Sequence, residues 1–454
     1  MEERRVFPIF VYFSFILFLG LSLRLVYCNT CLSKSSSYKA VKLQTVQSFA
    51  LPTAAAQQKM QAAPQATSHF TAQNPASLEP VLRWTKVEGA PAYELEVFAG
   101  KEKIVANKSI YTNGYNVSLP ENFQGKSIVW HVRGLDLERN PLTPFSADEV
   151  SYINKQLPPI KYPVPTNQYN SGKGRTLLYP VYNWVPVNGA AKYEVEVLSE
   201  EPENPQGAEP SQYRIGVGSA TGFDWYDDEK RVAFRPMYWR VRGVDAKGGP
   251  VGIFSPAQKF ETNPQKNYVV GTLGDSITHG GGAVSYSPGD WEYSYQNYMK
   301  FDSINLGESG DTSASMLARF DADVLPFHLK YLIIMGGSNS LRADVSAEDV
   351  ISDLENIKNK AEANGIMPVF LTLPAINPAN IKRVFDQPTA EDWQEKFAAV
   401  NAYIRTQRHI DLATKIPEQG PLPTYLATDG LHLDVPGKKL MAEAINEQWD
   451  NVIQ

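Results

Sequence analysis

The chain has 454 residues, a formal net charge of −6, 43% hydrophobic residues and 20% charged residues, an ordinary globular composition with room for about two to four domains. Acidic and basic residues are interspersed, so the sequence offers no basic face for nucleic acid. Cys28 and Cys31 are the two cysteines, both beside a hydrophobic amino-terminal segment, and the six histidines include no closely spaced ligand pair. We therefore expect neither a disulfide framework, nor a metal, nor a cofactor.

The first candidate element is a hydrophobic run at residues 7–23 that carries no charge. As a helix rising 1.5 Å per residue it would span roughly 25 Å, close to the thickness of a bilayer core. No small-x-small cleavage site follows directly, so we favour an uncleaved signal anchor over a cleaved signal peptide within residues 1–32. The expected location is extracytoplasmic, with the protein anchored in a membrane or secreted, at a bacterial cell surface.

The next stretch, residues 33–77, is rich in Ala, Gln, Ser, Thr and Pro. Two parts of it, residues 54–58 and 61–65, are nearly of low complexity. Such a composition cannot bury enough apolar surface to fold by itself, so we predict a linker that tethers the rest of the chain.

Two sequence blocks each occur twice, in the same order. The first starts at Trp84 and returns at Trp184, and the second starts at Trp130 and returns at Trp239. The residues of the first block are Trp84, Val87, Gly89, Ala90, Tyr93, Glu94, Glu96 and Val97, and each recurs one hundred positions later. Apolar and polar residues alternate in these stretches, as in strands with one buried face. The repeat therefore predicts two small antiparallel β-sandwiches, at residues 78–155 and 177–263, with a linker at 156–176.

The early tryptophan, the tyrosine about nine positions later and the late WxVRGxD stretch resemble fibronectin type III modules. This resemblance implies either a carbohydrate- or partner-binding module or a spacer, and we favour the spacer. Trp84, Trp130, Trp184 and Trp239 all fall on the inward face of the pattern. We expect them in the two cores and not on a sugar-binding surface.

Strand and helix signals alternate from residue 264 to residue 454. The predicted strands are 268–273, 331–335 and 367–373, and the predicted helices run from Ser346 to near Gly365, from Thr389 with Asp392 onward, and over 436–453. The hydroxyl of Ser346 can cap the first turn of its helix. This alternation predicts an α/β/α three-layer domain with a parallel sheet.

The stretch at residues 268–282, YVVGTLGDSITHGGG, ends its strand in Gly274, Asp275 and Ser276. In an open α/β sheet, ligands bind at the carboxyl ends of the strands, and a following helix presents free N–H groups to an anion there. Ser276 is therefore a candidate nucleophile. By itself the motif could equally be a turn in which Asp275 or Ser276 caps a helix.

Three later stretches offer the base and the oxyanion donors that an activated serine needs. Residues 305–312, NLGESGDT, follow a short apolar run and contain a glycine that can present its N–H without a side chain in the way. Residues 337–339, GSN, follow a strand and offer a side-chain amide. Residues 429–432, DGLH, place a carboxylate three positions before a histidine, a spacing that lets the aspartate orient the imidazole.

The blocks GDSITHGGG, NLGESGDTS, GSN and DGLH, in this order within about 190 residues, resemble the SGNH hydrolases, also called GDSL-type lipases and esterases. The resemblance implies the flavodoxin-like α/β/α fold of that family. It also implies that Ser276 is the nucleophile, that His432 is the general base and acid, and that Asp429 holds His432 in place.

The same resemblance implies an oxyanion hole. Its donors would be the N–H groups of Ser276 and Gly310 and the side chain of Asn339. The third donor departs from the family pattern, because Ser340 stands where the family usually has aspartate. Ser338 therefore remains an alternative to Asn339.

Four further residues near these blocks could line a substrate site. His279 follows Ser276 by three positions, and we favour a structural or pocket-lining role over that of a second base. The insert at 281–298 carries Trp291 and Tyr293, which would either wall the substrate pocket or pack as a lid. Arg342 would meet an anionic substrate, although a surface arginine is the default interpretation.

Together these features predict a serine esterase that works through an acyl-enzyme on Ser276. Export and the β-modules make an acetylated or otherwise acylated carbohydrate or cell-surface polysaccharide the leading substrate, and the expected partner is an acylated small molecule or polysaccharide. A lipid or thioester is the second enzymatic candidate. From another class, the chain could be a binding or adhesion protein without turnover, but an intact set of Ser276, Asp429 and His432 argues against a pure binder.

Overall fold

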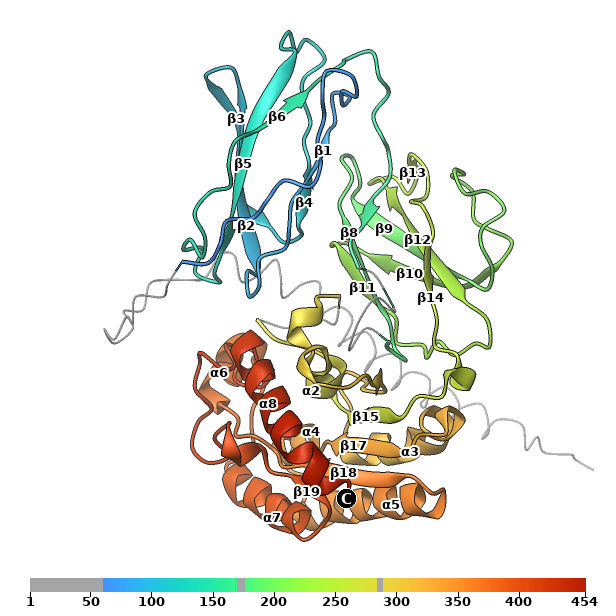
Figure 1. The fold of residues 1–454 in the computed structure, drawn as a ribbon, viewed down its shortest axis with the longest axis vertical. Coiled ribbons are helices and arrows are strands. Elements are labelled where there is room, and N and C mark those ends of the chain that lie inside the picture. Colours follow the sequence, from blue (N-terminus) through green and yellow to red (C-terminus); the bar gives the residue numbers. More distant parts are fainter. Residues whose placement is uncertain (1–59, 168, 170–175, 284–288) are drawn as a thin grey trace, which may run out of the picture.

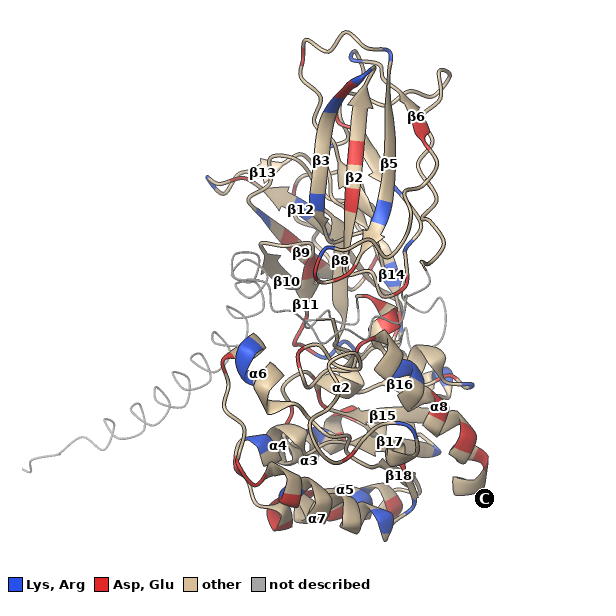
Figure 2. Cartoon of the chain, turned by 90° about the vertical axis from the view of Figure 1, so that its left-hand side faces the viewer, with Lys and Arg blue, Asp and Glu red and all other residues tan. Residues whose placement is uncertain are grey.

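The computed structural model describes residues 60–167, 169, 176–283 and 289–454. The hydrophobic segment at 7–23, both cysteines and the first part of the predicted linker lie outside these residues. Among the described residues, no helix is both long and apolar enough to cross a membrane. Figure 1 shows two β-rich modules above an α/β domain, and Figure 2 shows acidic and basic residues interspersed over all three units.

The first β-rich module contains two antiparallel sheets. Its strands are β1 (Val81–Arg83), β2 (Ala92–Ala99), β3 (Glu102–Ile110), β4 (Gly114–Asn116), β5 (Ser127–Leu135) and β6 (Glu149–Tyr152). One sheet pairs β1 with β4, and the other has the order β3-β2-β5-β6. Trp84 and Trp130 are buried in one hydrophobic core, with their rings 6.2 Å apart, so these two tryptophans are core residues as expected.

Residues 60–77 belong to the first module and not to the linker that we predicted over 33–77. Thr85 N donates a hydrogen bond to Gln65 O at 2.8 Å, and Phe70 packs against the core of the module. The prediction was wrong here because composition does not reveal that a polar stretch can find main-chain partners on a folded neighbour.

The second β-rich module repeats this plan. Its strands are β7 (Val164–Pro165), β8 (Val181–Val185), β9 (Lys192–Leu198), β10 (Arg214–Ala220), β11 (Asp224–Tyr226), β12 (Met237–Val244), β13 (Pro250–Val251) and β14 (Gln258–Phe260). One sheet has the order β11-β8-β7, and the other has the order β10-β9-β12, with β13 and β14 also paired to β12. Trp184 and Trp239 are buried in its core. Its first strand, β7, lies inside the linker that we predicted at 156–176.

The α/β domain is built on a five-stranded parallel sheet, which confirms the predicted sheet type. The strands are β15 (Val270–Gly274), β16 (Ile304–Asn305), β17 (Tyr331–Met335), β18 (Met367–Leu371) and β19 (His409–Ile410). The helices are α2 (Ser276–His279), α3 (Ser313–Asp323), α4 (Ser338–Arg342), α5 (Ala347–Ala363), α6 (Pro378–Phe385), α7 (Trp393–Arg405) and α8 (Val435–Val452). The order β16-β15-β17-β18-β19 is the flavodoxin-like order. In Figures 1 and 2 the sheet lies between α8 on one face and α5 and α7 on the other.

The predicted elements of this domain agree with the structure where the sequence carries a clear start signal. Ser346 caps α5, because its side chain accepts a hydrogen bond from Asp349 N at 3.1 Å. The predicted start at Thr389 was wrong, since α7 begins at Trp393 with Asp392 at the capping position. Among the elements we did not predict, α6 and β19 span 8 and 2 residues, too short for a periodic pattern to show.

The segment leading into the second module is part of the α/β domain. Leu178 N donates to Asn305 O at 2.9 Å, and Asn305 N donates to Thr176 O at 2.8 Å, so this segment pairs in parallel with the edge strand β16. Leu178 is 0% exposed and belongs to the core of the α/β domain. The second module is therefore joined to the α/β domain by main-chain pairing and by shared core, which a spacer would not need.

The first module also contacts both other units. Lys86 pairs with Asp290 of the α/β domain, and the ring of Tyr111 stacks on Phe223 of the second module with centroids 5.8 Å apart. Phe223 in turn packs with Val435 at the start of α8. The three units thus meet on the side of the α/β domain where α2 and α8 begin.

Truncating Leu178 tests whether its segment stabilises the α/β domain. We expect Leu178→Ala to lower the free energy of unfolding by about 2–5 kcal/mol, because it leaves a cavity in a shared core. Leu157→Ala is the matched control, since Leu157 is 40% exposed and its truncation should cost less than about 0.5 kcal/mol. Urea unfolding followed by circular dichroism measures both. Equal, small changes in the two variants would contradict the shared core.

Candidate active site

Ser276 lies where β15 turns into α2. A side chain at Gly274 is excluded, because a Cβ there would lie 2.2 Å from Met335 O. Asp275 caps α2 by accepting a hydrogen bond from Ile277 N at 2.9 Å, and burial raises the pKa of Asp275 to about 6. Asp275 therefore shapes the turn, as the capping interpretation expected. The cap leaves Ser276 at the first helical position, where its side chain is partly exposed.

The structure brings Ser276, His432 and Asp429 together. His432 Nε2 lies 2.8 Å from Ser276 Oγ, and His432 Nδ1 lies 2.9 Å from Asp429 Oδ2. Because a carboxylate only accepts, Nδ1 carries the proton and Nε2 is left to accept the Ser276 hydroxyl proton. This is the arrangement that a serine needs in order to lose its proton to a base.

Asp429 is held in its charged form by its neighbours. Its Oδ1 accepts the N–H groups of Leu431 and His432, each at 2.8 Å. Burial acts to raise the pKa of the Asp429 carboxyl, but the His432 ring and these donors hold it below the usual value. A buried carboxylate that stays charged can orient the imidazole and stabilise the imidazolium.

Residues 307–312, called here the oxyanion loop, lie beside the Ser276 turn. Glu308 N donates to Gly274 O at 3.0 Å, which ties the loop to the end of β15. Gly310 is exposed, and its φ of 95° lies in the region that glycine adopts freely. The loop therefore presents the main chain of Gly310 at the carboxyl edge of the sheet, and its role as an oxyanion donor stays a prediction.

Asn339 reaches the oxyanion loop. Asn339 Nδ2 donates to Asp311 O at 2.8 Å, and Arg342 Nη1 donates to Asn339 Oδ1 at 3.2 Å. These two bonds fix which way the amide faces. Ser338 is buried, whereas Asn339 is partly exposed. The geometry therefore favours Asn339 for the third donor position.

His279 does not line an open site. It is 1% exposed. Its Nδ1 lies 2.9 Å from Ser309 Oγ and its Nε2 lies 2.8 Å from Tyr179 O. Our expectation of a pocket-lining His279 was wrong, because the segment before the second module covers the ring. The structural role that we weighed beside it fits these contacts.

Trp291 and Tyr293 are packed, which is one of the two roles that we left open. Trp291 packs edge-on against Tyr169, with ring centroids 5.6 Å apart, beside the core of the second module. Tyr293 is buried in the cluster that includes Phe223 and Val435. The described part of the insert is thus packed between units, because the modules cover aromatic side chains that the sequence suggested were available for substrate. Its residues 284–288 lie outside the described part of the chain.

Arg342 lies where we expected it, beside the third block. Besides Asn339 it binds Gln387, with Nη2 donating to Oε1 at 3.1 Å, and burial lowers its pKa. Both acceptors in these contacts are amide oxygens, so neither contact neutralises the positive charge of the guanidinium. Contact with an anionic substrate stays a prediction.

Two residues of the site escaped the sequence analysis. Phe385, at the end of α6, meets the His432 ring edge to face, with centroids 5.9 Å apart. Lys438 is fully buried, and its Nζ donates to Ile277 O at 2.7 Å. Nothing in the sequence marks Phe385, but Lys438 shares the buried face of α8 with Met441 and Ala442, a spacing that could have revealed it.

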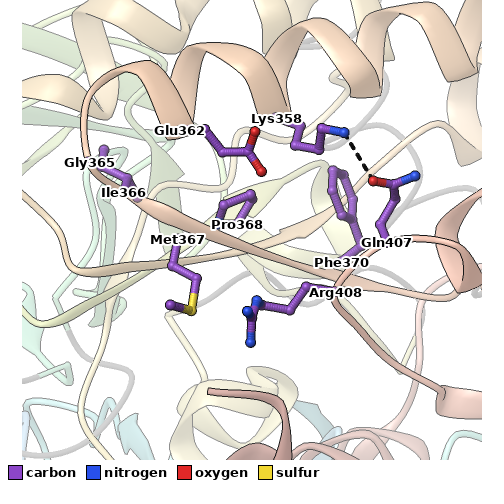
Figure 3. A pocket seen from close by; sticks show the side chains of 9 residues that line it. All are labelled: Lys358, Glu362, Gly365, Ile366, Met367, Pro368, Phe370, Gln407 and Arg408. Carbon is purple, nitrogen blue, oxygen red and sulfur yellow. Dashed lines mark hydrogen bonds between the residues drawn. The ribbon is translucent and has the colours of Figure 1, made fainter. Parts of the chain in front are cut away.

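A separate hollow of about 330 Å³ lies away from these residues (Figure 3). Its lining includes Lys358 of α5, Met367 at the start of β18 and Gln407, and a 3.0 Å hydrogen bond joins Lys358 to Gln407. The start of β18 is the amino edge of the parallel sheet, whereas Ser276 follows the carboxyl end of β15. This hollow therefore takes no part in the Ser276 site.

Comparison with known proteins places this domain in a family. Residues 272–440 match the sequence model of the GDSL-like lipase/acylhydrolase family. A comparison with curated proteins gave no match.

Solved structures similar to the chain include three that cover its carboxyl-terminal part. A GDSL-like lipase from Bacteroides thetaiotaomicron is 21% identical, with 41% of this chain and 90% of that chain covered and a TM-score of 0.33. A lipolytic protein of the G-D-S-L family from Desulfitobacterium hafniense is 23% identical, with 40% and 99% covered and a TM-score of 0.33. A mutant acetyl-xylooligosaccharide esterase from Geobacillus is 17% identical, with 40% and 93% covered and a TM-score of 0.31.

The buried Lys438 predicts a pH dependence of stability. Burial lowers its pKa to about 7, against 10.5 for an exposed lysine, so between these values the unfolded chain binds the extra proton. The free energy of unfolding should therefore rise with pH from about 7 upward, by at most about 1.4 kcal/mol per pH unit. Lys438→Met should lose this rise, whereas Lys439→Met, at an exposed position of the same helix, should keep it. Urea unfolding between about pH 7 and pH 9.5 measures the difference, and parallel curves for parent and Lys438→Met would contradict the assignment.

Proposed function

We propose that this chain, which carries a GDSL-like lipase/acylhydrolase domain over residues 272–440, is a serine esterase whose acyl-enzyme forms on Ser276. The observation that carries the proposal is the chain of two hydrogen bonds from Ser276 Oγ through His432 to Asp429, at 2.8 and 2.9 Å. A binding protein without turnover has no use for a serine activated in this way.

In the first step Ser276 Oγ attacks the ester carbonyl while His432 Nε2 takes its proton. The charge on the imidazolium is offset by Asp429. When the tetrahedral intermediate collapses, His432 returns the proton to the departing alcohol. Water then repeats the sequence on the acyl-enzyme and releases the acid.

The negative charge of the tetrahedral intermediate needs donors that are already in place. The N–H groups of Ser276 and Gly310 supply two of them in our proposal, and Asn339 Nδ2 supplies the third. An amide nitrogen carries two N–H bonds. Because Asp311 O takes one of them, the other is left for the substrate.

The substrate that we propose is an acetylated or otherwise acylated carbohydrate, such as a cell-surface polysaccharide. Ser309 and Gly310 are exposed beside the partly exposed Ser276, which suits an ester on a large hydrophilic alcohol. The β-rich modules, which we propose to be fibronectin type III-like, and the hydrophobic segment at 7–23 support an extracytoplasmic protein attached to a membrane or secreted.

A lipid or thioester is the second candidate substrate. It is favoured by Phe385, whose ring lies against His432 and would offer an acyl chain an apolar contact. Acyl-chain preference separates the two candidates, because a short acetyl group gains little from such a contact, whereas each buried CH₂ group adds about 0.8 kcal/mol.

The first activity test is a matched panel of 4-nitrophenyl acetate, butyrate and octanoate beside an acetylated oligosaccharide. We expect the full-length chain to prefer acetyl esters and Ser276→Ala to lower kcat by more than about 10⁴-fold. A preference for octanoate that is lost in Ser276→Ala would move the substrate to the lipid or thioester class. Parental activity in Ser276→Ala would contradict the esterase mechanism itself.

The third oxyanion donor is tested by a neighbouring pair of variants. Asn339→Ala should lower kcat by about 100- to 1,000-fold, because it removes one donor to the developing charge. Ser338→Ala, one position earlier, should change kcat by less than about threefold, since Ser338 is buried away from the exposed edge. Steady-state kinetics on 4-nitrophenyl acetate measures both. A larger loss in Ser338→Ala than in Asn339→Ala would assign the donor to Ser338.

A further inference from the structure

The oxyanion loop is held firmly at its ends. Glu308 N donates to Gly274 O at 3.0 Å on one side. On the other side Asp311 accepts Arg319 Nε at 2.6 Å and its carbonyl accepts Asn339 Nδ2 at 2.8 Å. The middle of the loop, residues 309–310, is exposed, although the proposed mechanism needs the Gly310 N–H at a fixed position beside the developing negative charge.

His279, buried beneath the loop, holds the middle of the loop through a hydrogen bond to Ser309. Ser309 Oγ lies 2.9 Å from His279 Nδ1, and His279 Nε2 lies 2.8 Å from Tyr179 O. A carbonyl oxygen only accepts, so Nε2 carries the ring proton. Burial lowers the pKa of His279 to about 4, which leaves the ring neutral and Nδ1 free to accept the Ser309 hydroxyl proton. The direction of both bonds is thereby fixed.

The far end of this chain of bonds is Tyr179, in the segment that leads into the second module. Tyr179 precedes β8, and its hydroxyl donates to Asp323 Oδ2 at 2.7 Å. The ring of Tyr226, at the end of β11, lies 4.9 Å from the His279 ring. In Figure 1 the lower end of this module faces α2. His279 is thus enclosed between the oxyanion loop, Tyr179 of the segment that leads into the second module, and Tyr226 of the second module itself.

We propose that His279 and Ser309 are positioning residues through which Tyr226 of the second β-rich module and Tyr179 of the segment leading into it hold the Gly310 N–H in place for the oxyanion. This inference rests on the proposed esterase function and adds a role for the second module, which acts as part of the catalytic unit. Neither side chain touches the reacting atoms. Each fixes the main chain that does.

The expected kinetic effect follows from what the loop binds. The Gly310 donor meets the oxyanion of the tetrahedral intermediate more closely than the carbonyl of the bound ester. Loss of its alignment should therefore lower kcat and leave KM unchanged. A merely structural role of the pair would instead lower the melting temperature without such a split.

The test is Ser309→Ala in the full-length chain, with 4-nitrophenyl acetate as substrate. Ser309 is exposed, so this variant should fold. We expect kcat to fall by about 10- to 100-fold, less than the loss of a whole donor, with KM within about twofold and an unchanged melting temperature. Ser309→Thr keeps the hydroxyl and should restore most of kcat. Ser352→Ala, at an exposed position of α5, is the control and should match the parent.

A second variant tests the coupling to His279. His279→Gln can keep a donor toward Tyr179 O but loses the acceptor for Ser309. If the pair acts as one unit, Ser309→Ala should add less than about twofold to the loss in His279→Gln, because coupled positions are not additive. Multiplication of the two losses would overturn the proposal.

Two outcomes distinguish this inference from the proposed function. If Ser276→Ala is inactive while Ser309→Ala keeps the parental kcat, the positioning role is wrong and the esterase mechanism stands. An increase in KM with unchanged kcat for Ser309→Ala would also overturn the positioning role. If Ser276→Ala keeps the parental activity, the proposed function fails and this inference fails with it.

Discussion

The site depends on one hydrogen bond, the 2.8 Å contact between Ser276 Oγ and His432 Nε2. These residues are 156 positions apart in the chain, so the contact exists only if β15 and the loop before α8 are brought to the same edge of one sheet. A parallel sheet does this by construction, because its strands all end at that edge. The flavodoxin-like strand order is therefore a precondition for the chemistry. It also brings the oxyanion loop to the end of β15 and Asn339 to that loop.

Buried charges around this contact balance one another. Burial raises the pKa values of Asp275 and Asp434 to about 6 and lowers that of Lys438 to about 7. Asp434 accepts Thr428 Oγ1 at 2.6 Å, and Lys438 holds the carbonyl of Ile277. Each charged group is thus fixed to main chain or hydroxyl near Ser276 or Asp429, which keeps the reacting side chains in a preorganised and polar environment.

The sequence was sufficient for the parts of the site that are local. Ser276, Asp429 and His432 could be predicted because each follows a strand end or a short motif whose spacing has a chemical meaning. The contacts of His279 could not be predicted, since Tyr179 lies 100 positions away in a segment that we had assigned to a separate unit. For the same reason the sequence left open whether Trp291 and Tyr293 wall a pocket or pack. An aromatic side chain looks available for substrate until the surface that covers it is known.

The account rests on Ser276 as the nucleophile of an assembled site. The most direct measurement is labelling of the folded, full-length chain with a fluorophosphonate probe, followed by peptide mass spectrometry to find the modified residue. The account predicts a single adduct on Ser276 whose rate of formation falls sharply in His432→Asn. Absence of an adduct on folded protein, or an adduct on another serine with Ser276 unmodified, would contradict it.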